Sequence, residues 1–203
     1  DIEITIDEIF EKYSKDYPIN YLIGKKNFYG RDFYLKDGVL IPRFETEILI
    51  ENILNLGVDF ENILDIGCGS GIISITLALE MPKSNVLGVD ISKVALDVSN
   101  RNKEILKARN CEFKESNLFS SINEKKFDLI VSNPPYINKE DMEVLDESVK
   151  KEPELALFGG EDGLDFYKAI IEKSHDHLNE NGYIAFEIGY NQGESIKELL
   201  SNN

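Results

Sequence analysis

The sequence predicts an α/β fold built on a doubly wound, mostly parallel sheet. From residue 61 onward, short apolar runs alternate with longer segments in which apolar residues recur at helical spacing. This alternation indicates βαβ units, because two parallel strands are joined by a crossover that is usually a helix. The chain has 203 residues, of which 42% are apolar and 30% charged, and this is enough for one such domain.

The elements of this domain can be placed in order along the chain. We expect strands at 62–67, 85–92, 111–116, 126–133 and 183–189. We expect helices at 71–82, 92–110 and 164–182. Proline and glycine stop helices, so Pro82 and Gly182 are the expected ends of the first and last of them. Ser92 is the expected N-cap of the second, because its hydroxyl can accept a hydrogen bond from a free backbone N–H.

The N-terminal part of the chain has a different pattern. Residues 1–16 predict a short amphipathic helix or an irregular leading segment. Residues 17–44 are rich in Tyr and Phe and are broken by Gly24, Gly30 and Asp37-Gly38, which predicts one or two β-hairpins. Helical spacing resumes at 45–57. We therefore divide the chain into a leading segment (1–16), a hairpin linker (17–44) and a main domain (45–203).

Charge and cysteine content limit the possible partners. The 22 basic and 38 acidic residues give a net charge of −16, which argues against a broad phosphate-binding face. Cys68 and Cys111 form neither a zinc pattern nor a disulfide framework, so we expect free thiols in a reducing compartment and no metal. The sequence contains neither a leader pattern nor an apolar run of about 18 residues. We expect a cytoplasmic protein that binds neither nucleic acid nor membrane.

Two features at strand ends predict a nucleoside site. "LDIGCGSG" places Gly67, Gly69 and Gly71 between a strand and a helix, where small residues let a ligand approach the backbone. Asp90 ends the next strand, where a carboxylate can accept hydrogen bonds from a ribose diol. The spacing is not that of a dinucleotide fingerprint, and no Walker lysine follows it. The glycines alone would also fit a tight structural turn.

The stretch "FDLIVSNPPYI" ends an apolar strand on two prolines. Proline fixes φ and donates no hydrogen bond, so Asn133-Pro134-Pro135-Tyr136 must hold one rigid shape after the strand. Such a platform offers a side-chain amide, a free backbone carbonyl and an aromatic face. A proline-stiffened turn with a surface Asn is the alternative interpretation.

Together these motifs resemble the Rossmann-like class I methyltransferases that use S-adenosylmethionine. "NPPY" is typical of members that act on planar nitrogens, such as adenine N6 or a glutamine amide. "YLIGKKNFYG", "LIPRFETE", "EPELALFGGEDGLDFY" and "EIGYNQGE" resemble the HemK/PrmC family of protein N5-glutamine methyltransferases, over about residues 18–199. The resemblance implies methylation of the Gly-Gly-Gln glutamine of class 1 peptide chain release factors, with S-adenosylhomocysteine as the second product. No long apolar stripe is left over once the elements are assigned, so we expect a monomer.

The resemblance also implies roles for individual residues. The cofactor would contact two sets, the loop and strand-end residues Gly67, Cys68, Gly69, Ser70, Gly71, Asp90, Asn117, Leu118 and Asn133, and the more N-terminal Arg43, Glu45 and Thr46. The substrate would contact Asn133, Pro134, Pro135, Tyr136, Glu152 and Pro153, of which the first four would be catalytic. The Asn133 side-chain oxygen and the Pro134 carbonyl would each accept one N–H of the substrate amide, and Tyr136 would supply a flat wall.

Several positions depart from the family pattern. Asn117 stands where Asp is usual, Phe44 where proline is usual, and Lys151 where an aromatic residue is usual. Only residues 1–16 could remain of the family's N-terminal helical domain, and the chain stops before the expected closing pair of strands. We therefore expect a fragment, or a chain ordered only in part.

Three other functions stay open at this point. One is methylation of adenine N6 in nucleic acid, which the charge of −16 disfavours. The second is methylation of a glutamine in a large-subunit ribosomal protein, which would use almost the same motifs. The third is cofactor binding without turnover.

Overall fold

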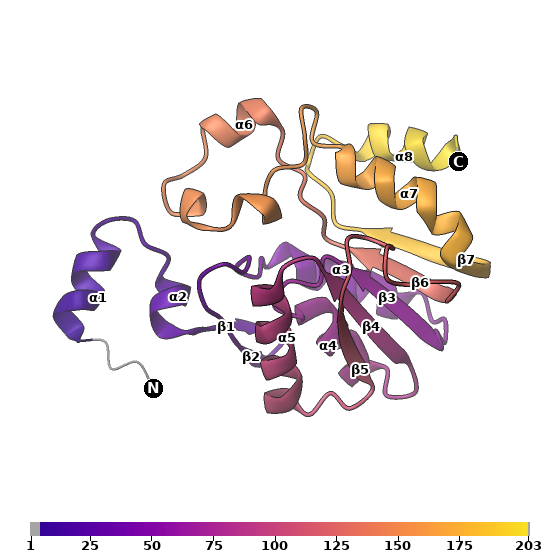
Figure 1. Ribbon diagram of the computed structural model, residues 1–203, viewed down its shortest axis with the longest axis horizontal. Helices are drawn as coiled ribbons and strands as arrows, with labels where there is room; N and C mark the ends of the chain where they lie inside the picture. The colour runs from indigo at the N-terminus through magenta and orange to yellow at the C-terminus, as the bar shows by residue number, and fades with distance from the viewer. Residues whose placement is uncertain (1–4, 203) are drawn as a thin grey trace.

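The computed structural model describes residues 5–202 and contains a five-stranded sheet with the order β5-β4-β3-β6-β7 (Figure 1). Every neighbouring pair in it is parallel. The strands are β3 (Asn62–Ile66), β4 (Asn85–Asp90), β5 (Cys111–Glu115), β6 (Phe127–Ser132) and β7 (Leu178–Phe186). The chain runs outward from β3 to β5 and then returns to add β6 on the other side of β3. The predicted doubly wound parallel sheet is confirmed.

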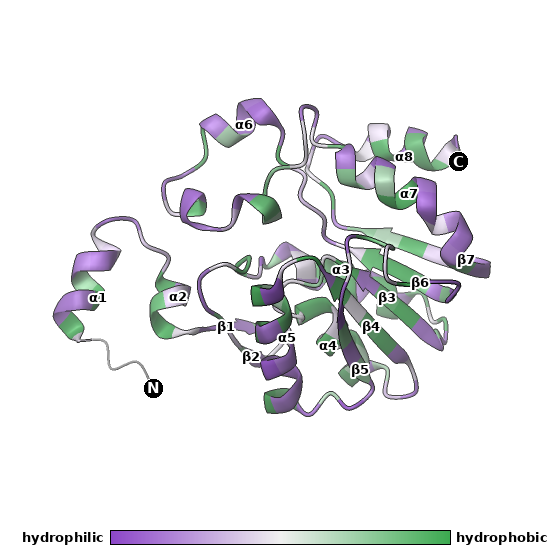
Figure 2. Ribbon diagram, viewed as in Figure 1, coloured by the Kyte–Doolittle hydropathy of each residue, from purple (hydrophilic) through white to green (hydrophobic). Residues whose placement is uncertain are grey.

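Helices cover both faces of this sheet. The helices α3 (Glu45–Asn55), α4 (Ile72–Glu80) and α5 (Lys93–Leu106) lie on one face, and α7 (Asp165–His177) lies on the other with α8 (Gly193–Ser201) packed against it. Alternate residues of β3 pack against the helices on opposite faces of the sheet. Ile63 is buried in the same cluster as residues of α3 and α4, and Leu64 in the same cluster as Ile170 of α7. The central strands are accordingly apolar over most of their length (Figure 2).

The N-terminal part contains two short helices, α1 (Ile6–Tyr13) and α2 (Ile19–Ile23), followed by one antiparallel hairpin of β1 (Lys25–Phe28) and β2 (Arg31–Tyr34). Phe28 and Phe33 bury the hairpin in the same core as α3 and α4. The Asn102 side chain fixes its end, since the Tyr34 N–H donates to Asn102 Oδ1 at 2.7 Å. The hairpin predicted within 17–44 is therefore present, and it packs on the main domain.

The boundary between the last predicted helix and strand was wrong. Helix α7 ends at His177 rather than Gly182, and β7 begins at Leu178 rather than Tyr183. Leu178 pairs with Phe127, and the register shifts before Leu129 pairs with Tyr183. The irregular part of β7 is tied to β6 by Asn179 Nδ2, which donates to Asp128 Oδ1 at 2.7 Å. Helical periodicity cannot reveal a contact of this kind.

The stretch between β6 and α7 is more structured than the sequence indicates. It holds α6 (Lys139–Glu143) and two 3₁₀ turns, Val149–Lys151 and Glu154–Ala156. None of the helices within residues 5–202 is long and apolar enough to cross a membrane.

Gly71, the N-cap of α4, cannot be replaced without strain. Its φ is +81°, and an added Cβ would lie 2.9 Å from Phe113 Cζ and 3.0 Å from Ser99 Cβ. We expect Gly71→Ala to lower the free energy of unfolding by roughly 2–4 kcal/mol, because left-handed backbone strain and overpacking add. Urea unfolding would measure the loss. Gly57→Ala is the control, since Gly57 also has a positive φ, +66°, but an added Cβ meets no atom within 4 Å. Equal losses in the two variants would contradict the packing part of this argument.

Candidate active site

A cavity lies at the carboxyl end of the sheet, where the strand order reverses between β3 and β6. Ligands of doubly wound sheets bind at this switch point. The cavity floor comes from the ends of β3, β4 and β6 and the segment after β5, and its cover comes from two distant segments, 38–46 and 153–156. Its polar and loop residues include Arg43, Thr46, Gly67, Cys68, Gly69, Ser70, Asp90, Ser92, Ser116, Asn117, Ser132, Asn133, Pro134, Pro135 and Pro153.

Two backbone hydrogen bonds fix the glycine loop after β3 to strand β4. Gly67 and Gly69 have φ values of +73° and +55°, a region that favours glycine. The N–H groups of Gly67 and Cys68 donate to the Val89 carbonyl at 2.8 and 3.0 Å. Gly67, Cys68, Gly69 and Ser70 thereby line the cavity, whereas Gly71 does not and serves packing instead.

Two buried titratable groups lie in or directly before this loop. Asp65 is buried and accepts hydrogen bonds from the N–H and hydroxyl of Ser74, which fixes the first turn of α4. Burial raises the pKa of Asp65 to about 7, against the opposing effect of those hydrogen bonds. Burial likewise raises the pKa of the Cys68 thiol. Cys68 therefore stays protonated and offers the cavity an apolar sulfur rather than a nucleophile.

Asp90 joins the loop to the end of β4. Its Oδ2 accepts from the Gly69 N–H at 2.9 Å, and its Oδ1 from the Ser92 N–H at 2.8 Å. Each carboxylate oxygen keeps a further lone pair for a ligand hydroxyl. Burial raises the pKa of Asp90, and the backbone hydrogen bonds oppose this. Asn117 and Leu118 line the same cavity from the segment after β5.

The proline platform forms the opposite wall. Asn133, Pro134 and Pro135 line the cavity directly after β6. Asn133 Nδ2 donates to Thr46 Oγ1 at 3.3 Å, and Thr46 is fully buried in the first turn of α3. Tyr136 is not among the lining residues; it packs against the buried Tyr167 and Ile171 of α7. Burial raises its pKa, so its hydroxyl stays protonated.

An ion pair joins the first segment of the cover to Glu152, the residue that directly precedes the second. Arg43 Nη2 lies 2.6 Å from Glu152 Oε1, and the Glu152 side chain is only 2% exposed. Glu152 Oε2 also accepts from the Ile41 N–H at 2.9 Å. The family resemblance implied a cofactor contact for Arg43 and a substrate contact for Glu152; the structure joins the two side chains to each other. Arg43 and Pro153 line the cavity, and Glu45 and Glu152 do not.

Breaking this ion pair should destabilise the fold. We expect Arg43→Ala to lower the free energy of unfolding by about 1–3 kcal/mol, because the Glu152 carboxylate would be left buried with one partner. Adding Glu152→Gln should restore part of the loss, since the buried group would no longer carry a charge. Urea unfolding of the single and double variants measures this, and a double variant as unstable as the sum of both singles would contradict it.

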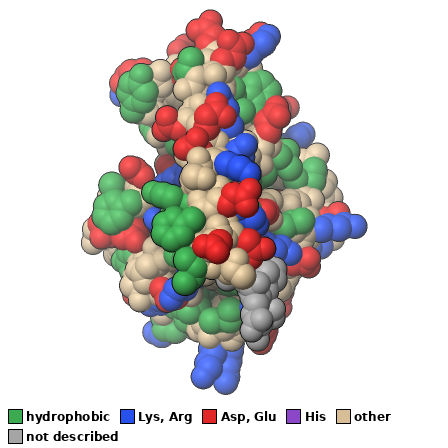
Figure 3. Space-filling model, turned by 90° about the vertical axis from the view of Figure 1, so that its left-hand side faces the viewer, with side chains coloured by type: hydrophobic (Ala, Val, Ile, Leu, Met, Phe, Trp, Pro, Cys, Tyr) green, Lys and Arg blue, Asp and Glu red, His purple; other side chains and the backbone are tan. Residues whose placement is uncertain are grey.

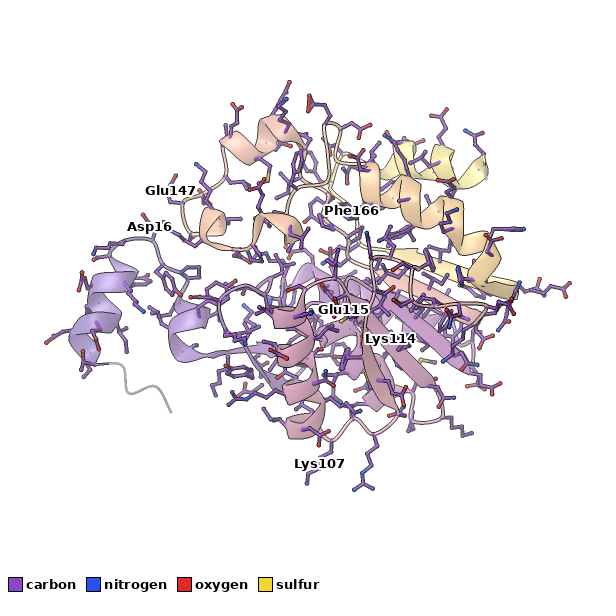
Figure 4. All side chains as sticks on the ribbon, in the orientation of Figure 1. Asp16, Lys107, Lys114, Glu115, Glu147 and Phe166 are labelled. Atoms are coloured by element: carbon purple, nitrogen blue, oxygen red, sulfur yellow. The ribbon has the colours of Figure 1, made fainter. Side chains whose placement is uncertain are left out.

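Sequence reasoning missed the apolar part of the cavity. Phe166 and Ile170 of α7 and Leu155 and Ala156 of the cover also line it. Phe166 lies above the carboxyl end of the sheet (Figure 4). Apolar residues at helical spacing indicate the side of a helix that packs on the core. The sequence therefore gives no sign that Phe166 and Ile170 of α7 line a ligand site. No group of side chains that could hold a metal ion occurs within residues 5–202.

Comparison of the sequence with known proteins places the chain among methyltransferases. The model of the family described as "Methyltransferase small domain" matches residues 44–161. The release factor glutamine methyltransferase of Fusobacterium nucleatum is 47% identical over 190 residues, which cover 92% of this chain and 54% of that protein. Its counterpart from Bacillus anthracis is 44% identical over 206 residues, covering 98% and 72%. The chain thus spans between about half and three quarters of the length of these relatives.

Solved structures support the same fold. The crystal structure of a methyltransferase from Pyrococcus furiosus superposes with a TM-score of 0.67 at 22% sequence identity, covering 91% of this chain and 83% of that one. This likeness confirms the predicted Rossmann-like class I methyltransferase fold.

Proposed function

The chain belongs to the release factor glutamine methyltransferases, and from this premise we propose that it methylates the glutamine of the Gly-Gly-Gln motif in class 1 peptide chain release factors. The methyl group would pass from S-adenosylmethionine to the side-chain amide nitrogen. The observation that carries the proposal is the place of Asn133, which lines the same cavity as the glycine loop and Asp90. A donor site and an amide-binding platform thereby share one space. We expect a monomer that works in the cytoplasm, where release factors act.

The residues that line the cavity fit S-adenosylmethionine. Asp90 offers one free lone pair on each oxygen for the two ribose hydroxyls. The backbone of Gly67–Ser70 has no bulky side chain to keep the rest of the cofactor away. Leu118, Phe166 and Ile170 provide apolar walls for a purine ring. When bound, the cofactor supplies an electrophilic methyl group on a sulfonium.

The proline platform would bind and orient the substrate amide. An amide nitrogen is a weak nucleophile, because its lone pair is delocalised into the carbonyl. Asn133 Oδ1 and the Pro134 carbonyl can each accept one N–H, which fixes the nitrogen against the cofactor side of the cavity. The same two acceptors favour the positive charge that develops on the nitrogen. The proton is lost afterwards, so no dedicated general base is needed.

The charge distribution supports a protein substrate over nucleic acid. The net charge is −16, and on the face shown in Figure 3 the basic side chains are interspersed with acidic and apolar ones. Nucleic acid binding requires basic residues gathered into a patch or stripe. A release factor or a ribosomal protein therefore fits this surface better than DNA or RNA does.

A substrate comparison tests the proposal. The chain would be incubated with radiolabelled S-adenosylmethionine and, separately, with a full-length release factor, a large-subunit ribosomal protein and adenine-containing DNA. We expect label only in the release factor. If the ribosomal protein or the DNA were labelled instead, that molecule would replace the release factor as the proposed substrate. Binding of S-adenosylhomocysteine by calorimetry without label in any of the three would favour a cofactor-binding module and contradict the proposal.

A further inference from the structure

Gln192 contacts the last residue of the proline platform, and the function proposed above gives it no role. It lies in the segment "EIGYNQGE", directly before α8, and it is buried. Its Nε2 donates to the Tyr136 carbonyl and to the Gly163 carbonyl, each at 3.1 Å. Its Oε1 accepts from the Gly189 N–H at 2.9 Å. One side-chain amide therefore joins the platform, the loop before α7 and the turn after β7.

The hydrogen-bonding partners fix which way the Gln192 amide points. A glutamine amide has two N–H donors on its nitrogen and only acceptors on its oxygen. The nitrogen faces two carbonyls and the oxygen faces an N–H, so a reversed amide would place like groups against each other at all three contacts. An ionised glutamate of the same shape could keep the contact with the Gly189 N–H but could donate to neither carbonyl.

Two glycines let the loop before α7 approach the platform this closely. An added Cβ at Gly159 would lie 2.7 Å from the Pro135 carbonyl oxygen and 2.8 Å from Tyr136 Cα. An added Cβ at Gly163 would overlap the Tyr136 carbonyl oxygen and lie 2.8 Å from Gln192 Nε2. Neither position has room for a side chain. This loop is therefore shaped around the platform, although neither glycine lines the cofactor cavity.

The platform needs support from outside because its two prolines have no N–H to donate. Directly beyond it, the Ile137 N–H donates to the Leu157 carbonyl at 2.9 Å. Within residues 5–202, Gln192 provides the only side-chain hydrogen bond to the backbone of residues 133–136. That bond fixes the chain two residues after the Pro134 carbonyl, which is the proposed backbone acceptor of the substrate amide.

We propose that Gln192 is a positioning residue that fixes the proline platform, and with it the Asn133 amide and the Pro134 carbonyl that would bind the substrate glutamine. It acts through the Tyr136 peptide and lines no part of the cofactor cavity. The role in turnover rests on the proposed function. The hydrogen bonds of Gln192 do not, and they can be measured without any substrate.

The kinetic test removes the two donors and keeps the shape. We expect Gln192→Glu to lower kcat roughly 10- to 100-fold, while KM for the release factor and the Kd of S-adenosylhomocysteine stay within about twofold. Asn110→Asp is the matched control. Asn110 Nδ2 also donates to backbone carbonyls, those of Ala78 at 2.9 Å and Ser84 at 2.8 Å, but it precedes β5 and so lies at the edge of the sheet away from the cavity. We expect this variant to lose stability in urea and to keep the wild-type kcat.

Gln192→Met separates the loss of hydrogen bonds from the added charge, because methionine has a similar length and no charge. We expect it to lower kcat at least about tenfold as well. A kcat within about threefold of wild type in folded Gln192 variants would overturn the positioning role. An equal loss of kcat in Asn110→Asp would also overturn it, since general destabilisation would then explain both. Equal losses of kcat and cofactor affinity would do the same, because Gln192 would then act on cofactor binding.

An NMR measurement on the wild-type chain separates this inference from the proposed function. Gln192 is the only glutamine in the sequence, so ¹⁵N labelling of glutamine side chains gives a single NH2 pair that needs no assignment. We expect both protons to exchange with water at least about tenfold more slowly than those of free glutamine, because each is held on a backbone carbonyl. If the chain methylates no glutamine, the proposed function fails, and slow exchange would still support the contact of Gln192 with the platform. Exchange as fast as in free glutamine would overturn the inference whatever the chain methylates.

Discussion

Replacing Asn133 with alanine is expected to lower kcat about 10²- to 10³-fold, with a much smaller effect on the Kd of S-adenosylhomocysteine. The side-chain oxygen is one of the two acceptors that would hold the substrate NH2, and it acts where charge develops during methyl transfer. Removing a fixed polar group of this kind costs the transition state more than the ground state. Steady-state kinetics with a release factor and calorimetry with S-adenosylhomocysteine measure the two quantities separately.

Two further variants sharpen this prediction. Asn133→Asp keeps the shape but loses the donor to Thr46 and adds a negative charge to the cavity wall, so we expect it to be nearly as inactive as the alanine variant. Asn100→Ala removes an exposed asparagine on α5 and should leave kcat unchanged. If Asn133→Ala kept more than a third of the wild-type kcat, the amide-binding role of the platform would be wrong.

Asp90 carries the second large expected effect, which lies in cofactor binding rather than turnover. We expect Asp90→Ala to raise the Kd of S-adenosylhomocysteine roughly 10- to 100-fold, because hydrogen bonds to a charged group contribute about 1.5–3 kcal/mol each. Asp90→Asn should lie between Ala and wild type. The asparagine can accept from only one of the two N–H groups that Asp90 now binds, those of Gly69 and Ser92. Calorimetry on the folded variants measures the order of the three affinities.

A matched control excludes a general charge effect on this result. Asp97→Ala removes an exposed carboxylate on α5 and should leave the Kd unchanged. An Asp90→Ala chain that binds within threefold of wild type would show that the ribose does not contact this residue.

The parts of the site that could be predicted from the sequence are the local ones. The glycine loop, Asp90 and Asn133 each directly follow a buried strand, and the α/β pattern brings the carboxyl ends of parallel strands to one edge. Their motifs lie within a few consecutive residues, so one sequence suffices to find them. The doubly wound parallel sheet and the hairpin extension follow from the same alternation and turn residues.

The parts that could not be predicted depend on contacts between distant residues. Arg43 and Glu152 are 109 positions apart, and no spacing rule relates the two charges. Glu187 opens the motif "EIGYNQGE", but its place beside the end of β6 follows only from the pairing of β7 with β6, after which its N–H donates to the Ser132 carbonyl at 3.1 Å. The same pairing fixes Leu178 as the start of β7, where helical spacing predicted a longer helix. The periodicity of apolar residues reports on one segment at a time, whereas these contacts form between two segments that are distant in the sequence.

Mapping the transferred methyl group tests the central claim most directly. The chain and S-adenosylmethionine would be incubated with a full-length release factor, and the product digested and sequenced by tandem mass spectrometry. We predict one methyl group on the side-chain amide of the Gly-Gly-Gln glutamine, and none on a factor in which that glutamine is changed to alanine. A methyl group on any other residue, or none although S-adenosylhomocysteine binds, would contradict the account.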